Sequence, residues 1–216
     1  MPEVWFIRHG ESISNANLVT SHPALSPLTP KGEQQALLIP GAFNGRKPDL
    51  IVTSSYLRAE QTAVPTLTQF DPIPYETWPV HEFTYLSPKR YDGTTGDQRA
   101  PFAQSYWQRA NPNEQEGGDG ESFRDCLARI HDTLARLRQH EAKFIAIFTH
   151  GIFARLLLWA ALTNTTSATS TSQQHAHQFI RAVRMPNAAI CVVHLTVDSL
   201  LFSNIQTKHL NARDGS

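Results

Sequence analysis

Phe144-Ile145-Ala146-Ile147-Phe148 is the stretch that decides the fold, because all five of its positions are apolar. A strand that faces water on one side alternates apolar and polar residues, whereas a strand covered by helices on both faces is apolar throughout. The stretch therefore predicts a central strand of a mostly parallel sheet.

Shorter apolar stretches and helical patterns alternate on both sides of this strand. The other predicted strands cover Val4–Ile7, Leu50–Val52, Ala189–Leu195 and Leu200–Ile205. The predicted helices cover Lys31–Ile39, Tyr56–Gln69, Ser122–His140 and Phe153–Leu162. This alternation predicts an α/β fold, a three-layer sandwich whose mostly parallel central sheet carries helices on both faces. The last two strands are close enough in sequence to form a hairpin, which would make one edge antiparallel.

Two regions lack this regular pattern. Residues 79–120 are rich in Pro, Gly and aromatic residues, and we expect a lid or insertion there, with some helix over Phe102–Arg109. Thr163–Ser172 consists almost wholly of small polar residues and is expected to be a loop. The length of 216 residues suits one domain over 1–216.

The composition narrows the classes of partner. Lys+Arg and Asp+Glu both number 19, so no basic surface for nucleic acid or for an anionic membrane is expected. Neither a signal sequence nor an apolar stretch of spanning length is recognisable. Cys126 and Cys191 are too few for a disulfide framework and have no metal-ligand spacing. We expect a soluble, cytoplasmic protein.

Polar residues whose side chains can bind ligands or react follow three of the predicted strands. Arg8-His9-Gly10 ends the first, Ser54-Ser55 with Arg58 follows the second, and His150-Gly151 follows the central one. In an open α/β sheet, ligands bind at the carboxyl edge, where strands stop and helix N-termini begin. Any one of these residues alone could be structural, but three together indicate a shared site.

Two histidines and two arginines without an acidic cluster suit the transfer of a phosphoryl group. Guanidinium groups bind phosphate oxygens bidentately, and a neutral imidazole is a nucleophile. Phosphoryl transfer needs mainly positioning and neutralisation of the phosphate oxygens. This chemistry demands neither a metal nor another cofactor.

Arg8-His9-Gly10-Glu11-Ser12, with Asn15 just beyond, resembles the signature of the histidine phosphatase (phosphoglycerate mutase-like) superfamily. Further matches extend this resemblance over nearly the whole chain. They are Pro27-Leu28-Thr29 with Gly32 and Gln35-Ala36; Ser54-Ser55 with Leu57-Arg58-Ala59 and Gln61-Thr62-Ala63; Gly117-Gly118 with Glu121-Ser122; Thr149-His150-Gly151; and Asn187.

The resemblance implies that His9 becomes phosphorylated and that Arg8, Arg58 and His150 bind the phosphoryl group. It also implies that Asn15 reaches the phosphoryl oxygens. Ser12 and Gly151 are further candidates for substrate contacts, with a helix cap as the alternative for Ser12. Glu11 is expected to orient groups beneath the site.

The family also supplies a general acid after the second helix, and Glu82 is the candidate here. Glu76 and the acidic residues of the insertion are its rivals. If the strand-like stretch Val80–Thr84 is extended, His81 and Glu82 point to opposite sides, and we choose Glu82 for the pocket. Neutral His9 would then attack phosphorus while Glu82 protonates the leaving oxygen, with protonated His150 stabilising the group in transit.

The expected activity is that of a metal-independent, histidine acid phosphatase-like phosphomonoesterase acting on a small phosphorylated metabolite. The alternatives are a phosphoglycerate mutase and a non-catalytic module that binds phosphate or a phosphoprotein. The mutases carry a Glu-Arg-His-Tyr-Gly-like stretch in the acid region, whereas this chain reads Glu82-Phe83-Thr84-Tyr85-Leu86.

The identity of the substrate stays open, because the insertion would define it. Cations of the insertion could meet further negative charge, and its aromatic residues could stack on a ring. Packing within the insertion is the favoured interpretation for both groups. The cations are Lys89, Arg90 and Arg99, and the aromatic residues are Tyr85, Tyr91, Phe102, Tyr106 and Trp107. His175 and His177 are two positions apart on a helical stretch, so a surface role is expected for them rather than a metal site.

Overall fold

A single mixed sheet organises the computed structural model, which describes residues 2–196 and 199–211. Within these residues the sheet has six strands in the order β3-β2-β4-β1-β5-β6. The strands are β1 (Glu3–Arg8), β2 (Leu50–Thr53), β3 (Tyr75–Thr77), β4 (Phe144–Thr149), β5 (Ile190–Leu195) and β6 (Leu200–Gln206). β1, β2, β3 and β4 pair in parallel, whereas β5 and β6 form the predicted antiparallel hairpin. The predicted mostly parallel sheet is confirmed.

The register of the central strands brings their carboxyl ends together. β4 lies between β1 and β2, with Arg8 opposite Thr149 and Thr53 opposite Phe148. Every residue of β4 is buried, as its uninterrupted apolar sequence predicts. His9, Ser54 and His150 each follow one of these three strands, so the sheet places them at one edge.

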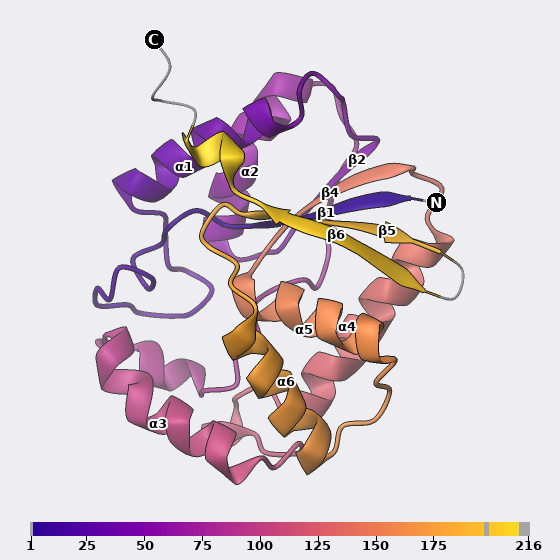
Figure 1. The fold of residues 1–216 in the computed structure, drawn as a ribbon. Coiled ribbons are helices and arrows are strands. Elements are labelled where there is room, and N and C mark those ends of the chain that lie inside the picture. Colours follow the sequence, from indigo (N-terminus) through magenta and orange to yellow (C-terminus); the bar gives the residue numbers. More distant parts are fainter. Residues whose placement is uncertain (1, 197–198, 212–216) are drawn as a thin grey trace.

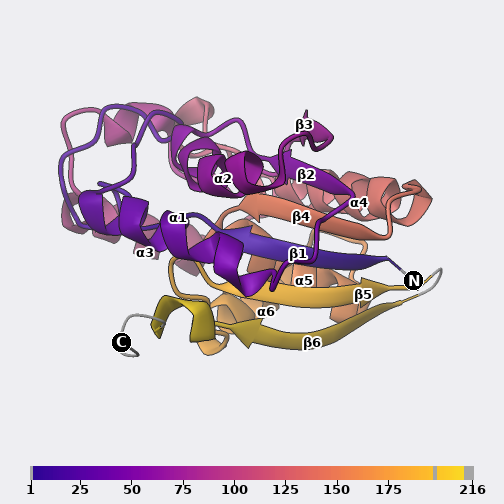
Figure 2. The same cartoon turned by 90° about the horizontal axis from the view of Figure 1, so that it is seen from above.

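Helices cover both faces of the sheet, as Figures 1 and 2 show. Alternate residues of each strand face opposite ways, so Trp5 and Ile7 join one core cluster while Val4 and Phe6 join the other. α1 (Pro30–Ala42) and α2 (Leu57–Phe70) cover the first face. α4 (Phe123–Gln139), α5 (Gly151–Thr163) and α6 (Ser170–Ala182) cover the second.

α6 overturns part of the expected loop at Thr163–Ser172. Thr163 still belongs to α5, and Ser170 already begins α6. The Thr169 side chain accepts a hydrogen bond from the Ser172 N–H, and the Ser172 side chain accepts one from the Thr169 N–H. This reciprocal capping starts the helix in spite of its polar composition.

Residues 79–120 contain more regular structure than the sequence suggested. The principal element is α3 (Gly96–Arg109), which includes the predicted Phe102–Arg109 and begins earlier, behind a capping box formed by Thr95 and Gln98. Short 3₁₀ turns lie at Pro88–Tyr91 and Glu116–Gly118, and another, η3 (Lys208–Asn211), follows β6. α3 lies beside α6 (Figure 1).

None of the helices within residues 2–196 and 199–211 combines the length and the apolar content that a membrane crossing requires.

Candidate active site

A small cavity lies at the carboxyl edge of the sheet and contains five of the predicted site residues. It has a volume of about 100 Å³, close to the size of a phosphoryl group with a few further atoms. The predicted residues that line it are His9, Ser12, Asn15, Arg58 and Glu82. Arg8, His150 and Gly151 are absent from this lining.

His9 is held in the form that a nucleophile needs. Its Nδ1 lies 2.6 Å from the carbonyl oxygen of Gly10. A carbonyl can only accept, so Nδ1 carries the proton and Nε2 keeps its lone pair. Burial, together with Arg58 and Arg8, holds the pKa of His9 well below its usual range. The imidazole is therefore neutral at neutral pH.

Arg58 contacts Nε2 of His9 directly. It stands in the first turn of α2, and its Nε lies 3.0 Å from His9 Nε2. Nη1 donates to the carbonyl oxygen of Pro23, which fixes the guanidinium at the cavity wall. Burial lowers the pKa of Arg58. A phosphoryl oxygen bound here could accept the hydrogen bond of Arg58 Nε in place of His9 Nε2. The lone pair of His9 Nε2 would then be free.

Arg8 lies against the start of α5. Its Nη1 donates to the carbonyl oxygen of Met185, while Nε is buried without a hydrogen-bond partner in the described part of the chain. Desolvation by burial lowers the pKa of Arg8 to about 10, so the side chain keeps its charge at neutral pH.

Gly151 makes room for Arg8 and does not line the phosphate-sized cavity. A Cβ at Gly151 would lie 3.0 Å from Arg8 Nε and 3.2 Å from its Cδ and Cζ. The absence of a side chain thus lets Arg8 pack against the first turn of α5. The expected substrate contact of Gly151 stays a prediction.

His150 lies beside His9 and forms a pair of imidazoles with it. Its ring centroid lies 5.1 Å from that of His9, and its Nε2 is 2.8 Å from the Ser54 hydroxyl. Nδ1 is buried and has no hydrogen-bond partner among the described residues. Burial and Arg58 hold the pKa of His150 well below its usual range. The neutral form is therefore favoured in the free site, and a protonated His150 beside a bound phosphoryl group stays a prediction.

Asn15 is oriented by its neighbours so that its amide nitrogen remains available. Its Oδ1 accepts hydrogen bonds from Ser12 N, Ser12 Oγ and Asn187 Nδ2. Asn187 Nδ2 also lies 3.2 Å from the carbonyl oxygens of His9 and Gly10. Turns, not a helix, follow Ser12, so the alternative role of Ser12 as a helix cap is wrong.

Glu82 faces His9 and Arg58 across the cavity. Its Oε1 accepts from the N–H of Phe153 at 2.8 Å, and its Oε2 accepts from the N–H of Ile152 at 3.1 Å. Both donors belong to the first turn of α5, where N–H groups have no partner within the helix. The carboxylate is therefore held in a fixed place at the cavity wall.

His81 and Glu76 lie elsewhere. The His81 ring stacks on Tyr56, with centroids 5.4 Å apart, and does not line the cavity. Glu76 binds the side chains of Trp78 and Arg136. Of the candidate acids considered in this segment, Glu82 is thus the one that shares a cavity with His9.

Glu11 lies outside the cavity, and its side chain contacts residues at the start of α1. Its carboxylate accepts from the Thr29 hydroxyl and from Lys31, and the Lys31 hydrogen bond lowers the pKa of Glu11. Gln35 accepts the N–H of Glu11, and Thr62 accepts the N–H of Gly10. These bonds fix the backbone on either side of Gly10.

Tyr56 and Arg129 support the site but were not singled out from the sequence. The Tyr56 hydroxyl lies 2.9 Å from the Thr84 hydroxyl, and its ring lies under Arg58 and beside His150. Arg129 pairs with Glu121 and donates to the carbonyl oxygens of Pro79 and His81. No local sequence motif signals contacts of this kind, because their partners are far apart in the chain.

The comparisons with known proteins agree with this geometry. The family model described as "Histidine phosphatase superfamily (branch 1)" matches residues 4–203. The adenosylcobalamin/alpha-ribazole phosphatase of Escherichia coli K12 is 25% identical over 169 residues, which cover 71% of this chain and 76% of the relative. A protein of Enterobacter sp. (strain 638) named "Probable phosphoglycerate mutase" is 29% identical over 158 residues, covering 70% and 71%.

Solved structures share the fold over almost the whole length. The alpha-ribazole phosphatase from Shigella flexneri superposes with a TM-score of 0.73 at 21% identity, covering 95% of this chain and 96% of the other. A mycobacterial glucosyl-3-phosphoglycerate phosphatase gives a TM-score of 0.71 at 23% identity, covering 94% and 98%. With the family model matched from β1 into β6, this chain belongs to the histidine phosphatase superfamily.

Proposed function

We propose that the protein hydrolyses a small phosphomonoester through a phosphohistidine formed on His9. One observation carries the proposal: the guanidinium groups of Arg8 and Arg58 are desolvated beside a neutral histidine, and neither has an ion-pair partner within the described residues. The Glu82 carboxylate acts on both charges but forms a salt bridge with neither. Two desolvated positive charges without a direct ion-pair partner are costly unless an anion joins them. A phosphoryl group in the adjoining cavity would supply that anion.

The proposed reaction has two steps. His9 Nε2 attacks phosphorus in line, the bond from phosphorus to the ester oxygen breaks, and Glu82 gives its proton to the departing oxygen. Water then attacks the phosphohistidine while Glu82 takes a proton from it, which releases phosphate and restores neutral His9. Arg8, Arg58 and the Asn15 amide bind the phosphoryl oxygens, and one of the neutral His150 nitrogens can donate to them.

Phosphoglycerate mutase activity is the second candidate, favoured by the 29% identity to the Enterobacter protein. A mutase returns the phosphoryl group from histidine to a bound intermediate, whereas a phosphatase gives it to water. The stretch Glu82-Phe83-Thr84-Tyr85-Leu86 supports the phosphatase, because it departs from the mutase-like pattern.

A panel of phosphomonoesters tests the proposal. Phosphate release and phosphoglycerate isomerisation are measured with the same purified enzyme, with and without a strong chelator. We expect hydrolysis of at least one ester to exceed isomerisation greatly and to persist with chelator, because the proposed steps use protein groups alone. Isomerisation as fast as the best hydrolysis would favour the mutase. Binding of phosphate without turnover of any ester would favour the non-catalytic module.

A further inference from the structure

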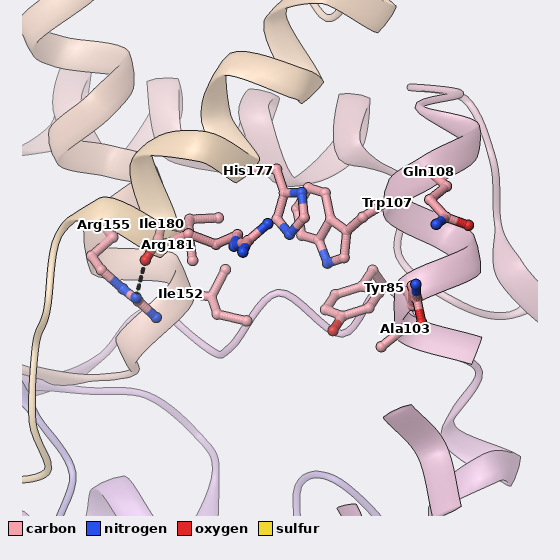
Figure 3. Close-up of a pocket in the computed structure, with 10 residues that line it drawn as sticks. Tyr85, Ala103, Trp107, Gln108, Ile152, Arg155, His177, Ile180 and Arg181 are labelled. Atoms are coloured by element: carbon pink, nitrogen blue, oxygen red, sulfur yellow. Dashed lines mark hydrogen bonds between the residues drawn. The ribbon is translucent and has the colours of Figure 1, made fainter. Parts of the chain in front are cut away.

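A second and larger cavity adjoins the candidate active site between α3, α5 and α6. Its volume is about 660 Å³, within the range of about 300–1,000 Å³ typical of small-molecule sites. Figure 3 shows Trp107 on the α3 side, Ile152 at the base of α5, and His177 and Arg181 on α6. None of these side chains takes part in the proposed chemistry.

The two cavities differ greatly in size. The cavity at His9, at about 100 Å³, has room for a phosphoryl group but little more. The organic part of any metabolite-sized ester must therefore lie outside it. The larger cavity has the volume that this part requires.

No residue lines both cavities, but neighbouring residues connect their walls. Thr84 lines the small cavity, and the next residue, Tyr85, lines the large one. Glu82 lines the small cavity and accepts the N–H of Ile152, whose side chain lines the large one. The two cavities are thus separated by the step from Thr84 to Tyr85 and by the first turn of α5.

The aromatic wall of the large cavity suits a planar group. Trp107 and His177 stack with centroids 4.4 Å apart and an interplanar angle of 7°. Tyr85 lies 5.3 Å from Trp107, tilted by 59°. Such rings favour another planar ring in stacked or edge-on contact over an alkyl chain of the same volume.

Two arginines give the same cavity a positive side. Arg155 uses Nε for the Gly151 carbonyl oxygen and Nη1 for those of Ile180 and Val183, while its Nη2 has no hydrogen-bond partner in residues 2–196 and 199–211. Arg181 is exposed, and within the same residues its side chain makes no hydrogen bond or ion pair.

The cations of the insertion differ from these two arginines. Lys89 pairs with Asp119 and Arg90 with Glu116, while Arg99 binds Thr20 and Thr94. Their charges or donors are already engaged, in agreement with the packing role favoured for them from the sequence. Arg155 and Arg181 are the cations that can meet a ligand in the large cavity.

We propose that the large cavity binds the organic part of the substrate, and that this part is a planar ring with a carboxylate or similar anionic group. The inference rests on the proposed phosphomonoesterase function and assigns a substrate class to it. The ring packs against Trp107, His177 and Tyr85, and the anionic group meets Arg155 and Arg181.

Phosphonates that the enzyme cannot hydrolyse test this assignment by calorimetry. The probes are propylphosphonate, phenylalkylphosphonates with one to three methylenes, and the same series with a 4-carboxyl group. The series of linkers covers the span between the cavities. For the best linker, we expect the ring to lower Kd about fivefold relative to propylphosphonate, and the carboxyl group to lower it about fivefold more.

Variants show which side chains cause the gain in affinity. Arg181→Gln should remove the advantage of the carboxyl group, and His177→Leu should remove much of the advantage of the ring. Both should leave propylphosphonate binding and the hydrolysis of a small alkyl ester unchanged. Arg138→Gln is the matched control, because Arg138 is an exposed arginine near the end of α4, at the opposite edge of the sheet.

The outcomes separate the two proposals. Propylphosphonate that binds, with no gain from ring or carboxyl group at any linker length, overturns the ring site and leaves the phosphatase intact. A gain that survives Arg181→Gln and His177→Leu also overturns it. No binding of any phosphonate, together with no ester hydrolysis, contradicts the proposed function itself.

Discussion

Among single residues, Glu82 has the most informative position. Its carboxylate lies in the cavity with His9 and Arg58 and is tied to the first turn of α5. An alkyl ester needs a proton on its leaving oxygen because an alkoxide is a poor leaving group. Nitrophenolate leaves with much less help. The two kinds of ester therefore report separately on the proposed acid.

Glu82→Gln should slow phosphoryl transfer from an alkyl ester by about 10²–10⁴-fold, the usual effect of losing a general acid. Transfer from a nitrophenyl ester should slow far less. Because the variant also lacks the proposed base for the water step, phosphohistidine should accumulate with the nitrophenyl ester. Single-turnover rates measure both steps. Equal, small losses for both esters and no accumulation would remove Glu82 from the mechanism.

Among the elements, α1 and the segment after β1 pack too closely for side chains. A Cβ at Gly32 would lie 2.0 Å from the carbonyl oxygen of Glu11, and one at Gly10 would lie 2.5 Å from the carbonyl oxygen of Gly32. These atoms belong to the backbone and cannot turn aside. The contact fixes the segment that carries His9 against the first turn of α1.

Gly32→Ala should therefore lower the free energy of unfolding by about 1–3 kcal/mol and also lower kcat/KM, because the segment around His9 must shift. Gly41→Ala in the same helix is the control, since nothing lies within 4 Å of a Cβ there. That control should keep full activity and gain up to about 1 kcal/mol from better helix propensity. Urea unfolding and steady-state kinetics measure both variants. Similar behaviour of the two alanines would contradict the account of this contact.

The elements that the sequence predicted are those with a strong apolar pattern. β4 is apolar almost without interruption, and α4 has regularly spaced apolar residues. The bounds of both agree with the prediction within a residue or so. β3 was missed because it has three residues at the edge of the sheet, two of them exposed. The start of α6 was assigned to a loop because it is rich in Ser and Thr, although the Thr169–Ser172 capping box is a local signal that could have located it.

The site was predictable where it follows strand ends and a family pattern. Those features are local in the sequence, and they indicate His9, Arg58 and His150. The close packing of Gly151 on Arg8 and the lowered pKa of His150 could not be predicted, because they depend on burial and on contacts between residues far apart in the sequence.

At the scale of the whole molecule, the buried histidines couple stability to pH. Burial and nearby arginines lower the pKa values of both His9 and His150 below the ordinary value of 6.5. Below pH 6.5 the unfolded chain therefore binds protons that the folded protein does not. Stability is retained above this pH and lost as the pH falls below it.

The free energy of unfolding should decrease between pH 6.5 and 5, with up to about 1.4 kcal/mol per pH unit from each of these two histidines. The double variant His9→Ala/His150→Ala should show a shallower slope, and replacement of the exposed His175 by alanine should not. Urea titrations at several pH values provide the slopes. An unchanged slope in the double variant would mean that these two imidazoles do not titrate abnormally.

Phosphorylation of His9 is the central claim, and rapid chemical quench with a ³²P-labelled phosphomonoester tests it most directly. The native protein should acquire label that is acid-labile and base-stable, as a phosphohistidine is, and the label should map to the peptide that contains His9. Glu82→Gln should retain more of this label with a nitrophenyl ester, and His9→Ala should acquire none and release no phosphate. Label on another residue, or substantial turnover by His9→Ala, would contradict the account.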